Sequence, residues 1–167
     1  MFVLGIDPGV SRCGYAVLET HRTRSIVRAL GVLRTPPEDP LSVRLAALSV
    51  DIGELFDEFD PASVAIERVL FGVNVKSAMS VGQASGLVMA EAGRRERPVT
   101  EYSPNQVKDA VTGNARAPKE QVMTMIQTLL GLSRPPRPAD AADAAAVALC
   151  HVARASLDLA AVGGARS

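Results

Sequence analysis

One long amphipathic segment lies between two short apolar runs and restricts the fold more than any other feature. Its apolar residues recur at steps of three and four over about five turns, at Leu41, Leu45, Leu48, Ile52, Leu55 and Phe59. This period predicts a helix with one buried face. Asp60-Pro61 ends it, and the flanking runs at 25–33 and 63–67 read as strands. A strand–helix–strand passage implies a parallel crossover, which indicates an α/β fold.

The rest of the chain divides into similar short elements. Apolar runs at 2–7, 14–19 and 25–33, with short connections, predict an antiparallel meander. A fifth strand is expected at 98–102, and helices at 76–95, 105–111, 119–130 and 139 to about 159. We therefore expect one domain over residues 1–159, followed by a disordered tail at 160–167.

Composition favours a globular cytoplasmic protein. No apolar run approaches the roughly 20 residues that a membrane helix needs, and the N-terminal run stops at Asp7 without the basic start of a signal peptide. Cys13 and Cys150 are the only cysteines, so a disulfide framework is not expected. The formal net charge is zero, which argues weakly against nucleic-acid binding, although a basic patch and an acidic cluster can cancel.

Four carboxylates occupy positions where a charge is costly. Asp7 and Glu67 each end an apolar run, and Asp140 and Asp143 stand three residues apart at the expected start of the last helix. A carboxylate at the end of a buried strand needs a positive partner. If all four converge, the partner suited to oxygen ligands is Mg²⁺, or Mn²⁺ in its place. Two such ions roughly 4 Å apart commonly support phosphodiester hydrolysis.

Each acid also has a purely structural interpretation. Asp7 before Pro8-Gly9 can cap a turn, and Glu67 can be an exposed strand end paired with Arg68. Asp140 and Asp143 have the spacing of a helix-capping pair. For the helix at 76–95, the small residues Ala78, Val81, Gly82, Ser85 and Gly86 suit either packing on the domain's own sheet or a dimer contact.

Several ordered motifs resemble those of the RuvC family of Holliday-junction resolvases. They are Gly5-Ile6-Asp7-Pro8-Gly9 with Gly14-Tyr15, Ala65-Ile66-Glu67, Asn74-Val75-Lys76-Ser77-Ala78, Gly82-Gln83-Ala84, Gln106-Val107-Lys108 and Asp140-Ala141-Ala142-Asp143-Ala144. The likeness runs from about residue 2 to residue 155. Each motif alone is modest, whereas the ordered set is highly specific.

This resemblance implies an RNase H-like fold, a five-stranded mixed sheet flanked by helices. It also implies a homodimer that binds a four-way DNA junction and nicks two opposing strands symmetrically with Mg²⁺. The family's acidic catalytic residues match Asp7, Glu67, Asp140 and Asp143, and its paired lysines match Lys108 and Lys119. A branch-migration motor of the RuvA and RuvB type is the implied partner.

The expected DNA contacts include one departure from the family pattern. Basic residues that can surround the acids are Arg68, Lys76, Lys108, Arg116 and Lys119. After the catalytic Glu the family carries one or two aromatic residues, and here the first such position holds Leu70. Phe71 can stack on a junction base instead, or Leu70 can act as an apolar wedge; a local hydrophobic anchor is the structural alternative for Phe71.

Two other functions compete with the nuclease. The first is a catalytically silent protein of the same fold that binds DNA junctions, although four retained, mutually repelling acids have no physical purpose in such a protein. The second is a sugar kinase or actin-like ATPase, which shares the strand–turn opening. The chain is too short for the two lobes of those enzymes, and Asp7-Pro8-Gly9 lacks a following Thr.

Overall fold

The computed structural model describes residues 1–21, 24–68 and 75–164 of the 167-residue chain. The strands are β1 (Phe2–Asp7), β2 (Arg12–His21), β3 (Arg24–Arg34), β4 (Ser63–Glu67) and β5 (Val99–Tyr102). The helices are α1 (Leu41–Phe59), α2 (Val75–Arg94), α3 (Pro104–Thr112), α4 (Lys119–Leu129) and α5 (Ala139–Gly164). Every element expected from the sequence is present.

The strands of the described part form one five-stranded mixed sheet in the order β3-β2-β1-β4-β5. β1, β2 and β3 pair antiparallel, as short connections between strands favour. β4 pairs parallel with both β1 and β5. The predicted meander and the parallel crossover through α1 are therefore confirmed.

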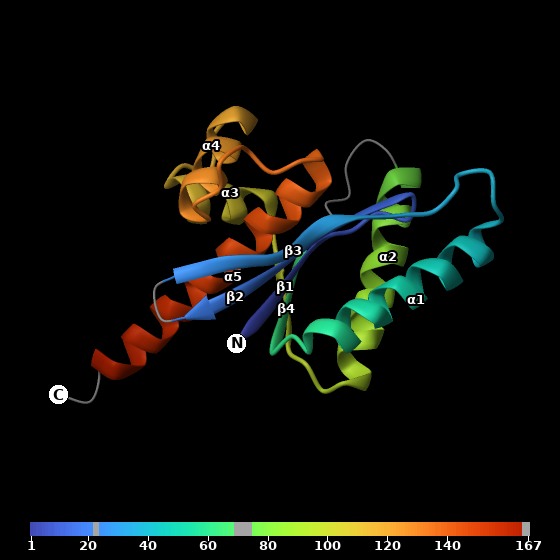
Figure 1. Cartoon of the computed structure of the whole chain (residues 1–167), viewed down its shortest axis with the longest axis horizontal. Helices are drawn as coiled ribbons and strands as arrows, with labels where there is room; N and C mark the ends of the chain where they lie inside the picture. Colours follow the sequence, from blue (N-terminus) through green and yellow to red (C-terminus); the bar gives the residue numbers. More distant parts are fainter. Residues whose placement is uncertain (22–23, 69–74, 165–167) are drawn as a thin grey trace.

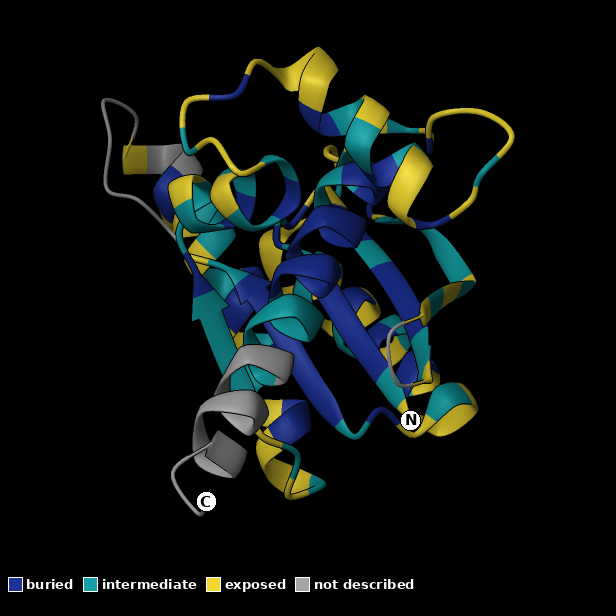
Figure 2. Ribbon diagram, turned by 90° about the vertical axis from the view of Figure 1, so that its left-hand side faces the viewer, coloured by how far each residue is buried: buried dark blue, intermediate teal, exposed yellow. Residues whose placement is uncertain are grey.

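Helices cover both faces of this sheet (Figure 1). α1 and α2 pack on one face against Leu4, Ile6 and their neighbours in β2 and β4. α3, α4 and α5 pack on the other face, where Val3 belongs to the core. β1 and β4 read as continuous apolar runs because both of their faces are buried. Figure 2 shows the buried strands beneath the first turns of α5.

One buried face and one helix boundary differ from the expected ones. The buried face of α1 consists of Leu48, Ile52, Leu55 and Phe56, whereas Leu41, the first residue of the helix, is 45% exposed. α5 continues to Gly164, beyond the expected end near Leu159. Alanine, the strongest helix former, is frequent in this segment. The predicted disorder stays a prediction for residues 165–167, which lie outside the described part.

The small residues of α2 divide between two surfaces. Ala84, Val88 and Ala92 are buried against the sheet with Ser85. At Gly82 and Gly86, which are exposed, a Cβ would meet no atom within 4 Å. Of the small residues named from the sequence, Ala78 and Ser85 are buried, as the packing interpretation expects, whereas Gly82 and Gly86 leave an open surface. No helix in the described ranges has the length and apolar character needed to cross a membrane.

Candidate active site

The two strand-end acids are brought together by the parallel pairing of β1 and β4. Ile6 is the register partner of Ile66, so Asp7 and Glu67 follow it at the same edge of the sheet. Each is only partly exposed. This is the placement that the crossover through α1 predicts.

α5 reaches the same edge because two glycines let its backbone come close to the sheet. A Cβ at Gly14 would overlap the carbonyl oxygen of Asp140, and a Cβ at Gly5 would overlap that of Ala144. Gly14 is also the register partner of Asp7. The β1–β2 pair therefore positions both Asp7 and the start of α5, the helix that carries Asp140 and Asp143.

The helix acids lie within the first turns of α5. The carbonyl of Pro138 accepts hydrogen bonds from the amides of Ala141 and Ala142, at 3.1 and 3.3 Å. The helix therefore begins before Asp140, which is a first-turn residue rather than an N-cap. The capping-pair interpretation fails in this respect, although an acid in the first turn is still favoured by the helix dipole.

Both helix acids are paired with cations. Arg12 Nε donates to Asp140 Oδ2 at 2.9 Å, and its Nη2 contacts the same oxygen. Lys119 Nζ donates to Asp143 Oδ2 at 3.1 Å. Lys119 was expected here, but Arg12 was not. Arg12 and Asp140 are 128 residues apart in the sequence, so no local sequence pattern indicates this ion pair.

The strand acids stand in a different electrostatic environment. Burial, followed by the charges of Glu67, Asp143 and Asp140, raises the pKa of Asp7 from 3.8 to about 7, although Lys119 lowers it. Burial and then Asp143 also raise the pKa of Glu67, against Lys119 and Lys108. The hydrogen bond from Arg12 lowers the pKa of Asp140. Nearby positive charge would therefore stabilise the ionised strand acids.

A cavity of about 210 Å³ opens beside these acids. Glu67 and Asp143 line it together with both expected lysines, Lys108 from α3 and Lys119 from the start of α4. Its other lining residues are Pro104, Val107, Val122 and Ala146. A phosphate in this cavity would meet carboxylates and ammonium groups together.

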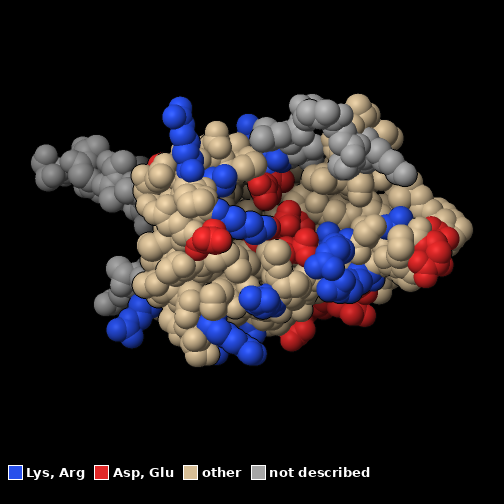
Figure 3. Space-filling view, turned by 90° about the horizontal axis from the view of Figure 1, so that it is seen from above, with Lys and Arg blue, Asp and Glu red and all other residues tan. Residues whose placement is uncertain are grey.

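The remaining predicted contacts are placed only in part. Arg68 and Arg116 are exposed, and the Arg68 amide donates to the carbonyl of Tyr102 at 2.8 Å. Figure 3 shows acidic side chains near the middle of one face with basic side chains around them. Leu70 and Phe71 lie outside the described residues, as does the side chain of Lys76.

The four acids offer a suitable donor set for a hard divalent cation. All their ligand atoms are carboxylate oxygens, which Mg²⁺ prefers, and burial and neighbouring acids raise the pKa values of Asp7 and Glu67 in spite of the nearby lysines. As arranged, no three His, Cys, Asp or Glu side chains within the described ranges are close enough to enclose an ion. An ion held by all four acids would compete with Arg12 for Asp140 and with Lys119 for Asp143.

Known proteins resemble this chain over nearly its full length. Residues 3–151 match the family model described as crossover junction endodeoxyribonuclease RuvC. A relative of that name from Corynebacterium glutamicum is 46% identical over 93% of this chain and 71% of its own length. Another, from Streptomyces avermitilis, is 48% identical over 93% of this chain and 89% of its own.

Solved structures agree with the sequence matches. Thermus thermophilus RuvC, solved in complex with a Holliday junction substrate, superimposes with a TM-score of 0.90 at 35% identity, covering 95% of this chain and 96% of that one. The yeast mitochondrial resolvase Ydc2 shares the fold at 19% identity, with a TM-score of 0.68 over 93% of this chain and 80% of its own. The expected RNase H-like architecture is confirmed, and the chain belongs to the RuvC family of crossover junction endodeoxyribonucleases.

Proposed function

We propose that this protein is a Mg²⁺-dependent endonuclease that resolves four-way DNA junctions by symmetric nicking of two opposing strands, in homologous recombination and DNA repair. The observation that carries the proposal is a small cavity lined by Glu67, Asp143 and two lysines, close to which Asp7 feels the charges of the other three acids. Membership of a family of metal-dependent nucleases supports it.

The four acids are the proposed metal ligands. Asp7, Glu67, Asp140 and Asp143 would hold the ions, Mg²⁺ by preference with Mn²⁺ as a substitute, and the donor set suits two of them. When bound, the metal supplies an activated water and neutralises charge on the phosphate oxygens. The ionised forms of Asp7 and Glu67, disfavoured by burial and mutual repulsion, then become favourable.

Lys108 and Lys119 are the proposed catalytic cations. They line the cavity from two helices and face Glu67 and Asp143. An ammonium group at this place stabilises the negative charge that builds on a phosphate during displacement. Lys119 bonds to Asp143. If its ammonium group bonded to a DNA phosphate instead, the Asp143 carboxylate would be free to bind a metal.

The proposed DNA-binding set extends beyond the cavity. Arg68 and Arg116 are exposed cations that can contact the phosphate backbone. Lys76, Leu70 and Phe71 complete the set on the strength of the sequence alone. Because the net charge is zero, DNA attraction depends on this local concentration of positive charge and weakens as salt rises.

We also infer a cytoplasmic homodimer that cooperates with a RuvA and RuvB type motor. Symmetric cutting of two strands requires two active sites. On α2, Met79 is 60% exposed, and the exposed Gly82 and Gly86 let another backbone approach closely. This surface is the proposed dimer contact, because small residues around an apolar side chain suit a self-complementary interface.

A cleavage assay tests the proposal directly. The purified protein is incubated with a labelled mobile four-way junction or a linear duplex, over a series of Mg²⁺ concentrations. We expect paired, symmetric nicks in the junction and none in the duplex. A catalytically silent junction binder would instead shift the junction in a native gel and yield no nicked product at any Mg²⁺ concentration.

A further inference from the structure

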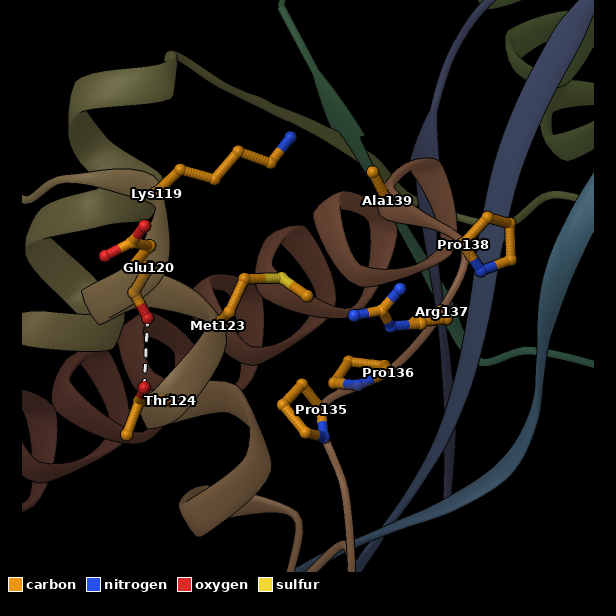
Figure 4. Close-up of a pocket in the computed structure, with 9 residues that line it drawn as sticks. All are labelled: Lys119, Glu120, Met123, Thr124, Pro135, Pro136, Arg137, Pro138 and Ala139. Carbon is orange, nitrogen blue, oxygen red and sulfur yellow. Dashed lines mark hydrogen bonds between the residues drawn. The ribbon is translucent and has the colours of Figure 1, made fainter.

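A second, larger hollow of about 780 Å³ lies between α4 and the segment that leads into α5 (Figure 4). Lys119 and Met123 come from α4, and Pro135, Pro136 and Arg137 come from the segment opposite. Its volume is within the range of small-molecule sites. Apart from Lys119, none of its lining residues has a role in the proposed chemistry.

The walls of this hollow combine apolar and cationic groups. Met123 and the two prolines give apolar surface, and the side chains of Met123 and Arg137 point toward one another across the space (Figure 4). Lys119 and Arg137 contribute positive charge, while Glu120 is the one acid among the lining residues. A ligand that joins a planar, largely apolar ring to a negatively charged group matches this combination.

The hollow adjoins the candidate active site. Lys119 lines both spaces and bonds to Asp143 at 3.1 Å. Ala139, which also lines the hollow, directly precedes Asp140. A nucleotide adjoining a phosphate at the acids would therefore lie within reach of the hollow.

We propose that this hollow receives one unstacked nucleotide of the cleaved strand, next to the scissile phosphate. The base would lie against Met123 and the prolines, and Arg137 would contact a backbone phosphate. This inference rests on the proposed function, since it assigns a subsite for the same substrate. It also gives a physical source of junction selectivity: extruding a base costs least where stacking is already interrupted, as at a strand exchange, and most in a continuous duplex.

The first test compares two truncations on the same helix. Met123→Ala removes apolar wall surface, while Leu129→Ala removes a 47% exposed apolar side chain that does not line the hollow. After the nick has been mapped, cleavage is measured on the intact junction and on junctions with an abasic nucleotide on either side of it. We expect Met123→Ala to slow cleavage of the intact junction about five-fold, and Leu129→Ala to leave it within two-fold.

The abasic junctions identify the contact. If the base occupies the hollow, removing it from one side of the nick slows wild type, and Met123→Ala then has no additional effect on that junction. Equal effects of Met123→Ala on intact and abasic junctions would overturn the proposal, as would no effect on either. Thermal unfolding of each variant identifies a loss caused by poor folding.

A binding measurement separates this proposal from the nuclease assignment. Junctions carrying 2-aminopurine beside the nick are titrated with protein without divalent metal, so that no strand is cut. We expect the fluorescence to rise as the base unstacks, and the rise to be reduced in Arg137→Gln. The rise should be retained in Arg134→Gln, because Arg134 lines a neighbouring hollow but not this one. Failure of wild type to cut any junction would reject the nuclease. Normal cutting with no fluorescence change at either position, as expected if the hollow instead holds a partner peptide, would reject only the subsite.

Discussion

The two pairs of acids at the site use the same chemical group in opposite environments. Asp7 and Glu67 end buried strands, and burial together with neighbouring acids raises the pKa of both. Asp140 and Asp143 lie at the start of α5, where Arg12 and Lys119 bond to them. For Asp140 the hydrogen bond from Arg12 lowers the pKa.

This difference indicates how a cluster of like charges is tolerated in a folded domain. The helix pair is compensated by cations from the chain itself and by the helix dipole. The strand pair is not matched with a cation at salt-bridge distance in the described part, and it bears the cost of burial. A bound metal would therefore relieve the largest electrostatic cost at Asp7 and Glu67. Asp140 and Asp143 would have to exchange their present cation partners for the metal.

The largest expected effect is on catalysis. Asp7→Asn should lower junction cleavage by about 10³-fold or more, because a metal ligand that supports several kcal/mol of transition-state stabilisation is lost. Junction binding in a native gel should stay within about two-fold, since the basic residues are unchanged. Cleavage at the wild-type rate would reject Asp7 as a metal ligand.

The next effect concerns stability and pH. The pKa of Asp7 is higher in the folded state than its ordinary 3.8, so its ionisation destabilises the fold, and this cost grows as pH rises from about 4 through about 7. Without divalent metal, Asp7→Asn should therefore be more stable than wild type at pH 8 by about 2–4 kcal/mol, and little different at pH 4. Chemical denaturation at both pH values measures this.

Asp140→Asn is the matched control from the other pair. Its carboxylate is stabilised by Arg12, so its loss should not raise stability at pH 8. Adding Mg²⁺ should raise the melting temperature of wild type more at pH 8 than at pH 5, since ionised carboxylates bind the ion. An Asp7→Asn variant no more stable than Asp140→Asn at pH 8 would contradict the proposed difference between the pairs.

Gly14→Ala tests how the helix pair is brought to the strand pair. The added Cβ would overlap the Asp140 carbonyl, so we expect a loss of about 1–3 kcal/mol of unfolding free energy together with reduced cleavage. Gly53→Ala, in α1 with no atom within 4 Å of the added Cβ, should instead stabilise the protein by about 0.5–1 kcal/mol. Thermal melts of both variants make the comparison, and a neutral Gly14→Ala would show that α5 does not depend on this close approach.

The smallest expected effect is that of Arg12→Gln. Loss of the hydrogen bond should raise the pKa of Asp140 toward 3.8, which NMR titration of the carboxyl can follow. The pKa of Asp140 is lower in the folded protein than its ordinary value, so its ionised form stabilises the fold at neutral pH. The variant should therefore lose at most about 1 kcal/mol of unfolding free energy at neutral pH, as for an exposed ion pair. An unchanged Asp140 titration would show that the pair does not persist in solution.

Local patterns in the sequence predicted the elements and the identity of the acids. The three-and-four spacing of Leu48, Ile52 and Leu55 is sufficient for α1, and the apolar runs ending at Asp7 and Glu67 are sufficient for two neighbouring strands. These signals are reliable because burial of one helix face, or of both strand faces, constrains residues that are close in sequence.

Contacts between distant residues were decided only by the tertiary structure. Arg12 and Asp140 are 128 residues apart, and the approach of α5 to Gly14 depends on how a helix lies across two strands. The division of α2 into a buried and an open surface, and the hollow between α4 and the proline segment, likewise arise from packing of elements onto one another. By itself the sequence determined the fold class and which residues carry charge; the tertiary structure decided which charges are compensated, because compensation depends on distances between elements that no local spacing encodes.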